Sequence, residues 1–176
     1  MKNIYLGYII FFSLIFYCCS ENNITGNILE EGLNFYLLKD STVTASQITD
    51  SNIYNIRLAE KPFLSYKDIE YYNWVEHSFK VDPNKVKVIS NICKNNHTVF
   101  GIPFIITVDR ERIYHGAFWF LFSSVAPTSP YIDAPLGNGN TSNIFVINRS
   151  WDSTKQDLRN DPRIYNTLKK CGLLIE

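Results

Sequence analysis

Two β-rich runs separated by only three residues constrain the fold of this chain more than any other feature. The first run covers residues 103–108, the second covers residues 112–119, and Asp109-Arg110-Glu111 lies between them. Runs rich in Ile, Val, Tyr, Phe and Trp at such close spacing predict a β-hairpin. The connection has no glycine, so Arg110 must either occupy a type I turn or adopt a less favourable backbone conformation.

Other strands are predicted where apolar and polar side chains alternate or where a short apolar run stands alone. Residues 33–38, 53–58 and 74–81 each place apolar side chains on one face, residues 86–92 form a weaker strand, and residues 144–147 form a short last strand. An alternation with a period of two residues is typical of strands that are buried on one side. The sequence therefore predicts a mostly antiparallel β structure.

Two helices are expected beside these strands. Ser65 and Asp68 have the spacing of a capping box, which predicts a short helix that runs to about residue 72. Asp161-Pro162 supplies an N-cap and a first-turn proline for a C-terminal helix that Gly172 ends, with an apolar stripe at Ile164, Leu168 and Cys171. The predicted fold class is α+β, mostly antiparallel β, as a sandwich-like or curled sheet with a short internal helix and a C-terminal helix.

The first 18 residues have the layout of a secretion signal. Lys2 is followed by an almost uninterrupted apolar run over residues 4–17, which is shorter than the roughly 20 residues that a membrane-spanning helix needs. The run ends at Cys18-Cys19 and resembles the bacterial lipoprotein signal, in which a cysteine is acylated and becomes the mature N-terminus. Cys18 is small enough to precede the acylated residue, so we expect Cys19 to carry the lipid, with Cys18 as the alternative.

This reading divides the chain into residues 1–18 as a lipoprotein-type signal peptide, 19–32 as a lipidated N-terminus and polar tether, and 33–176 as a single β-rich globular domain. It predicts a protein of the cell envelope that is lipid-anchored to a membrane and faces away from the cytoplasm. The alternative is an uncleaved N-terminal anchor helix.

Composition narrows the classes of partner. The chain has 17 basic and 17 acidic residues, and 45% of it is hydrophobic, as expected for a folded domain with a real core. Nucleic-acid binding depends on Lys and Arg that neutralise phosphates, and no basic excess is present. Nucleic acid is therefore excluded as a partner, and the membrane contact is expected to run through the N-terminal lipid.

Cysteine and histidine give no sign of a metal site. Outside the leader only Cys93 and Cys171 remain, and they either form one disulfide or stay as two separate thiols. The chain contains no CxxC pair, and its three histidines lack the spacing of ligands on one strand or helix. We expect no metal and no cofactor.

One pairing could support catalysis. Ser123 and Ser124 follow an aromatic run, with His115 in the preceding strand as a candidate base, which gives an envelope hydrolase as an alternative function. No GxSxG or SxxK motif positions either serine. Hydroxyl groups that satisfy the backbone of a turn explain the same residues, so the sequence favours a domain that is not an enzyme.

The long irregular segment over residues 120–143 and the strand before it offer a contact surface. Its aromatic anchors are Phe118, Trp119, Phe122 and Tyr131, next to backbone stiffened by proline. The alternative is that these aromatic rings fill the core.

Residues 101–114, with Gly116-Ala117-Phe118-Trp119 and the Asn160-Asp161-Pro162-Arg163-Ile164 segment, carry a resemblance. They resemble a group of uncharacterised small bacterial lipoproteins over roughly residues 33–172, although that group more often has a turn glycine at the position of Arg110. The resemblance implies no activity. The expected function is a membrane-anchored envelope lipoprotein with a non-enzymatic interaction or ligand-binding domain for a protein or small ligand. The hydrolase and a structural accessory lipoprotein are the alternatives.

Overall fold

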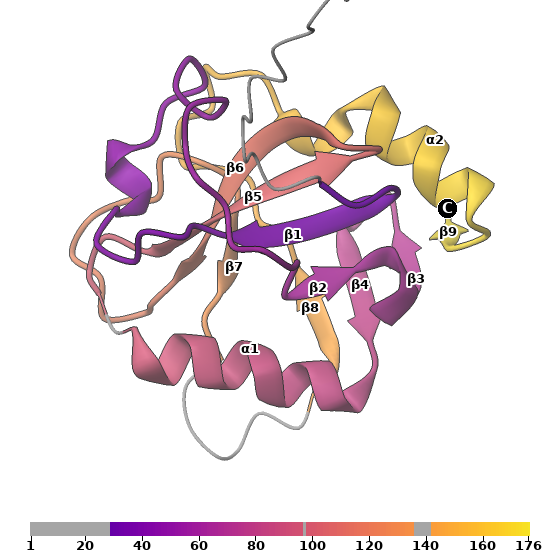
Figure 1. Ribbon diagram of the computed structural model, residues 1–176, viewed down its shortest axis with the longest axis horizontal. Helices are drawn as coiled ribbons and strands as arrows, with labels where there is room; N and C mark the ends of the chain where they lie inside the picture. The colour runs from indigo at the N-terminus through magenta and orange to yellow at the C-terminus, as the bar shows by residue number, and fades with distance from the viewer. Residues whose placement is uncertain (1–28, 97, 136–141) are drawn as a thin grey trace, which may run out of the picture.

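The computed structural model describes residues 29–96, 98–135 and 142–176. Within these residues nine strands form two mixed sheets, accompanied by two α-helices, so the predicted α+β, mostly β fold class is confirmed. Figure 1 shows the helix α1 (Pro83–Asn95) beneath the strands and the helix α2 (Pro162–Lys170) at one end of them.

The larger sheet has five strands in the order β2-β1-β5-β6-β7. Its strands are β1 (Leu33–Leu37), β2 (Leu64–Ser65), β5 (Ile102–Val108), β6 (Glu111–Trp119) and β7 (Tyr131–Asp133). The smaller sheet has four strands in the order β8-β4-β3-β9. Its strands are β3 (Ile69–Asn73), β4 (Ser78–Val81), β8 (Ile144–Val146) and β9 (Leu174–Ile175). Pairing is antiparallel except between β6 and β7 and between β3 and β9.

A core of aromatic rings joins the two sheets. Phe35 and Phe104 of the larger sheet are buried, and the Phe35 ring lies 5.7 Å from that of Phe79 on β4. Ile89 and Cys93 of α1 are buried in the same core. The other face of the larger sheet is covered by the chain between β1 and β2, which buries Ile53 and Leu58 there.

The predicted hairpin is confirmed as β5 and β6, which pair from Ile102 with Phe118 to Val108 with Glu111. Asp109 and Arg110 both have positive φ, at 45° and 75°. Arg110 thus adopts the less favourable conformation, because a two-residue hairpin turn that matches the strand twist needs positive φ at both positions.

Replacing Arg110 with glycine should raise the free energy of unfolding by about 0.5–1 kcal/mol, since glycine adopts positive φ without strain. The substitution also removes an ion pair of Arg110 with Glu31, but both side chains are more than half exposed and such pairs contribute little. Urea unfolding measures the change, with Glu31→Gln as the control for the lost ion pair. A variant no more stable than the parent would contradict the account of the turn.

The main correction to the predicted elements is that residues 83–95 form a helix, where a weak strand was expected over residues 86–92. Asp82 caps the helix by accepting a hydrogen bond from the Asn84 backbone N–H at 2.7 Å, and Pro83 occupies the first turn. Ile89 and Cys93 are buried one turn apart. The helical period and the cap therefore outweigh the β-branched composition of the segment.

Three shorter predictions also need correction. The capping box of Ser65 and Asp68 is present, but it caps only the 3₁₀ turn η2 (Tyr66–Asp68), and β3 replaces the rest of the expected helix. Residues 53–58 form turns, with one isolated bridge between Leu38 and Leu58. The strand expected over residues 74–81 begins only at Ser78, because residues 74–77 turn and His77 has φ 50°.

The C-terminal helix and the first and last predicted strands are confirmed as α2, β1 and β8. Asp161 caps α2 with a hydrogen bond from the Arg163 backbone N–H at 2.9 Å, and Gly172 ends the helix region with φ 69°. Ile164 and Leu168 are buried as the stripe predicted, whereas Cys171 is exposed. The segment expected to be a loop over residues 120–143 contains β7, and residues 136–141 lie outside the described part.

Candidate functional site

A pocket of about 320 Å³ lies on the outer face of the larger sheet. It is bounded by residues 48–50 of the chain between β1 and β2, by His115 on β6, by residues 128–130 before β7, and by residues 149–150 and 155–158 after β8. This volume is at the small end of ligand sites.

His115 forms the base of the pocket. Its neighbour Tyr114 points into the core, so the alternation of β6 places the imidazole on the opposite face. The residue is 5% exposed, and neither ring nitrogen has a hydrogen-bond partner among the described residues. Burial lowers the pKa of His115, and Lys155 adds to this effect while Asp50 opposes it. The ring is therefore neutral at pH 7, with one nitrogen as a donor and the other as an acceptor.

Ser129 lies beside the base of the pocket. It is 3% exposed, and its hydroxyl also has no partner among the described residues. Its segment is held against β6 by a hydrogen bond from the Ala117 N–H to the Pro130 carbonyl at 3.1 Å. Gly116 permits this approach, since a Cβ there would lie 2.5 Å from the Phe104 ring and 3.1 Å from the Pro130 oxygen.

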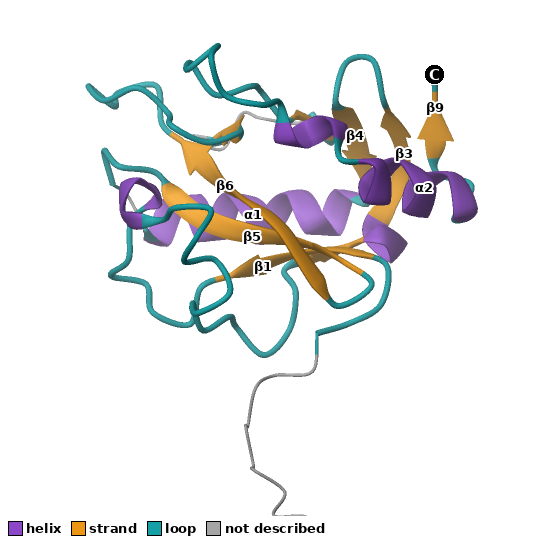
Figure 2. Ribbon diagram, turned by 90° about the horizontal axis from the view of Figure 1, so that it is seen from above, coloured by secondary structure: helices purple, strands orange, loops and turns teal. Residues whose placement is uncertain are grey.

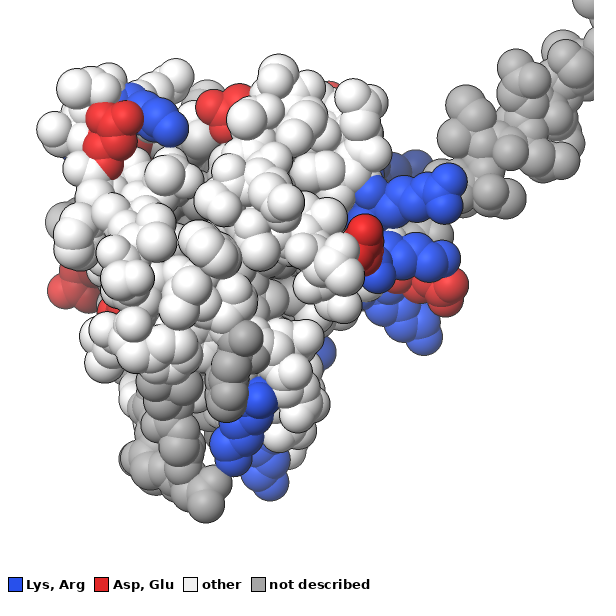
Figure 3. Space-filling model, turned by 90° about the vertical axis from the view of Figure 1, so that its left-hand side faces the viewer, with Lys and Arg blue, Asp and Glu red and all other residues white. Residues whose placement is uncertain are grey.

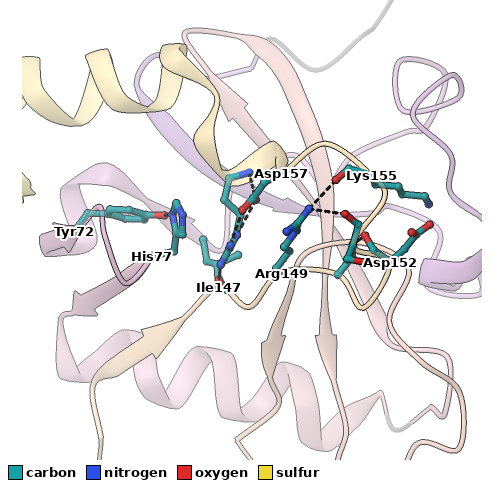
Figure 4. Close-up of polar contacts among 10 residues, drawn as sticks. Tyr72, His77, Ile147, Arg149, Asp152, Lys155 and Asp157 are labelled. Carbon is teal, nitrogen blue, oxygen red and sulfur yellow. Dashed lines mark hydrogen bonds and ion pairs between the residues drawn. The ribbon is translucent and has the colours of Figure 1, made fainter.

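Two cations stand at the rim. Arg149 donates from Nη2 to the carbonyls of Ser153 and Lys155, at 3.1 and 2.9 Å, and so shapes the loop that closes this side (Figure 4). Lys155 Nζ lies 3.5 Å from the Thr128 carbonyl across the pocket mouth. Neither Arg149 nor Lys155 is among the candidate site residues that the sequence predicts.

The two acids of the pocket are not equivalent. Asp157 makes two hydrogen bonds with Arg159, at 2.8 and 2.6 Å, and these bonds lower the pKa of Asp157. Arg159 also donates to the Ile147 carbonyl at 2.9 Å (Figure 4). Asp50 is 73% exposed at the side chain, with Oδ1 3.8 Å from His115 Nδ1. Because Arg159 neutralises Asp157, the charged residues left in the pocket lining are Arg149, Lys155 and the outlying Asp50. Asp152 lies near the two cations, and its hydrogen bonds with Thr154 lower the pKa of Asp152 with help from their positive charges.

The other buried histidine has a structural role. His77 is 6% exposed and its Nδ1 lies 3.2 Å from the Tyr72 hydroxyl (Figure 4), while its carbonyl accepts from the Ile147 N–H at 2.9 Å. Burial lowers the pKa of His77, and Arg159 adds to the effect. His97 lies outside the described residues.

The predicted aromatic surface is divided by the structure. Phe118 is fully buried and Trp119 is 8% exposed, so these two are core residues, as the alternative reading of the strand held. Tyr131 is half-buried at the start of β7, and Phe122 is 54% exposed on the loop after β6. The prediction that Phe118 and Trp119 belong to a contact surface is therefore wrong, because β6 is covered on both faces. Phe122 is exposed because it follows the end of this strand.

The predicted serine and histidine pairing is not assembled. The Ser123 hydroxyl donates to the Val99 carbonyl, and neither Ser123 nor Ser124 lines the pocket that contains His115. The nitrogens of His115 remain without a partner among the described residues.

Cys93 and Cys171 are free thiols, so the disulfide weighed from the sequence is absent and the alternative of two separate thiols holds. Cys93 is buried near the C-terminal end of α1, and Cys171 is exposed directly after α2. Figure 1 shows the two helices in different parts of the molecule, α1 beneath the strands and α2 at one end of them. Burial raises the pKa of the Cys93 thiol to about 12. Cys18 and Cys19 lie outside the described residues.

The described residues contain no group of His, Cys, Asp and Glu side chains arranged to hold a metal ion. No helix in the described ranges has the length and apolar character to cross a bilayer. Comparison of the chain with family models, with curated proteins and with solved structures finds no match.

Proposed function

We propose that this chain is a lipid-anchored envelope protein whose folded domain binds a small anionic ligand in the His115 pocket without chemical conversion. The observation that carries the proposal is a pocket whose base holds two buried side chains, His115 and Ser129, with unused hydrogen-bonding atoms. A buried polar atom without a partner costs about 1–3 kcal/mol, so an occupant that satisfies these atoms is favoured.

The charges at the rim indicate the class of ligand. Arg149 and Lys155 favour a carboxylate at the mouth, and the neutral imidazole and the hydroxyl favour a group that both donates and accepts, such as an amide or a hydroxyl. The nitrogens of His115 are shielded from solvent, and the exposed Asp50 side chain places Oδ1 3.8 Å from Nδ1. The ligand reaches the imidazole by displacing Asp50.

The binding test uses N-acetylglycine, which combines a carboxylate with an amide, and its uncharged analogue N-acetylglycinamide. In saturation-transfer NMR on the full-length protein in detergent, we expect binding of the acid and little of the analogue. Lys155→Gln should weaken binding about tenfold, since a charge-assisted hydrogen bond contributes on the order of 1.5–3 kcal/mol. The exposed Lys87 of α1 supplies the control variant Lys87→Gln. Equal binding of acid and analogue, or equal effects of both variants, would refute the assignment.

The anchor rests on the sequence of the leader. We expect fatty-acid label on the wild type and on Cys18→Ala, and none on Cys19→Ala. Label lost only in Cys18→Ala would move the acylated position to Cys18, and label retained in both single variants and in the double variant would refute the lipid anchor. An anchored protein that binds no small carboxylate would leave the structural accessory role as the better description.

A further inference from the structure

Five exposed apolar side chains gather on the two loops at one end of the β5–β6 hairpin. We call them the loop-tip patch: Val99, Phe100, Leu121, Phe122 and Val125. Leu121 is 87% exposed and Phe122 is 54% exposed, the largest values among the five. The loops lie side by side because β5 and β6 pair up to Ile102 and Phe118, next to the residues of the patch.

Side-chain contacts hold the patch in one arrangement. The Ser123 hydroxyl donates to the Val99 carbonyl of the other loop, and the Ser123 backbone N–H donates to the Phe120 carbonyl at 2.9 Å. The rings of Phe120 and Phe122 stack with their centroids 5.1 Å apart. The patch is therefore presented on a turn with defined hydrogen bonds.

The two loops of the patch carry no charged side chain. Residues 98–108 and residues 113–132 contain no Lys, Arg, Asp or Glu, and neither do residues 41–49 of the neighbouring chain segment. Figure 3 views the molecule from the side on which these loops lie in Figure 1, and the charged side chains gather at the periphery of that face. Figure 2 shows α2 at the opposite end of the sheets.

The size of this apolar surface is at the upper end of what a monomer exposes. Trp151 is 70% exposed and adjoins the face, because its backbone N–H donates to the Pro127 carbonyl at 3.3 Å. With about 150–250 Å² for a whole aromatic side chain, the patch and Trp151 together expose on the order of 600 Å². Two copies of such a face bury roughly 1,200 Å² in total, which reaches the range of specific interfaces.

We infer that the loop-tip patch is the interface of a homodimer, in which the patch of one copy packs against the same patch of a second. In a two-fold dimer each patch meets itself, so any charge at its centre would face a like charge, and this face has none. The two loops offer a charged partner no complementary group. A bilayer surface, which is commonly anionic, finds no Lys or Arg on the two loops.

Photo-crosslinking in the native envelope tests the contact directly. Benzoylphenylalanine at position 121, introduced into the full-length chain, should give a product of twice the mass of the processed monomer seen in the same envelope sample, identified by mass spectrometry as two copies of this protein. The same probe at Val75, which is 77% exposed on the turn between β3 and β4, is the matched control and should give none. Adducts at position 121 with lipid or with another protein in place of this dimer would overturn the inference.

Sedimentation equilibrium of the full-length protein in detergent gives the strength of association. The double variant Leu121→Asp/Phe122→Asp should dimerise about 100-fold more weakly than wild type, whereas Val75→Asp should match wild type. Both sites are exposed, so folding is retained, and a thermal melt verifies it. If a detergent micelle merely holds two lipid anchors together, the wild type, the double variant and Val75→Asp will associate equally. That result would overturn the homodimer, and so would a monomeric wild type. The outcome is independent of ligand binding in the His115 pocket.

Discussion

Phe104→Ala should lower the free energy of unfolding by about 3–5 kcal/mol, because the ring fills the centre of the core shared by the two sheets. Phe104 is fully buried, and its ring centroid lies 5.2 Å from that of Phe118 and 5.9 Å from that of Phe35. The alanine variant leaves a cavity among rings that come from the two neighbouring strands, β1 and β6. The loss is of the same order as the whole stability of many domains of this size.

Urea unfolding followed by fluorescence measures this loss. The control is Tyr54→Ala, since Tyr54 is 65% exposed and its truncation should change the unfolding free energy by less than about 0.5 kcal/mol. A loss of under about 1 kcal/mol for Phe104→Ala would show that this core is not packed as described.

Arg159→Ala should cost about 2–4 kcal/mol, the second-largest effect we expect. The substitution leaves Asp157 without its partner in a half-buried position and removes the hydrogen bond to the Ile147 carbonyl. The side chains of the pair are 15% and 19% exposed, so the loss approaches that of breaking a buried ion pair. The freed carboxylate of Asp157 also places a negative charge in the pocket, so binding of N-acetylglycine should weaken.

Arg163→Ala is the matched control for this experiment. Arg163 forms the same two-bond pairing with Asp161, but its side chain is 46% exposed, and such pairs contribute about 1 kcal/mol or less. Thermal and urea unfolding of both variants compare the two pairs directly. Asp157 and Asp161 are both 19% exposed at the side chain, so equal losses would show that the deeper burial of Arg159 has no energetic consequence.

The sequence predicts an element correctly where all the local patterns of a segment favour the same kind of element. The hairpin of β5 and β6 and the helix α2 carry clear signals, an apolar run on each side of a turn and an Asp-Pro cap with a closing glycine. The same Asp-Pro signal stands at Asp82-Pro83, but the Val and Ile residues that follow it favour a strand. Burial of one side of α1 against the core decides between the two, and this depends on contacts distant in sequence.

The pocket could not be predicted as a unit. His115 stands out in the sequence, but the charged residues that line the same pocket come from two other segments that share no motif with it: Asp50, Arg149 and Lys155. Only the pairing of β6 with β5 and the path of the chain over the outer face of the sheet bring them together. Likewise, alternation along β6 could not show that both faces of this strand are covered, which is why Phe118 and Trp119 are core residues.

The most direct test of the central claim, that His115 is a neutral ligand-binding group in the pocket, is NMR of the full-length protein with ¹⁵N-labelled histidine rings. The three imidazoles give three sets of signals, and His115→Gln identifies that of His115. At pH 7 we predict the shifts of a neutral ring, and on addition of N-acetylglycine a change in both nitrogen signals of His115 but not of His77. A charged ring, or signals of His115 that stay unchanged while the ligand binds, would contradict the account.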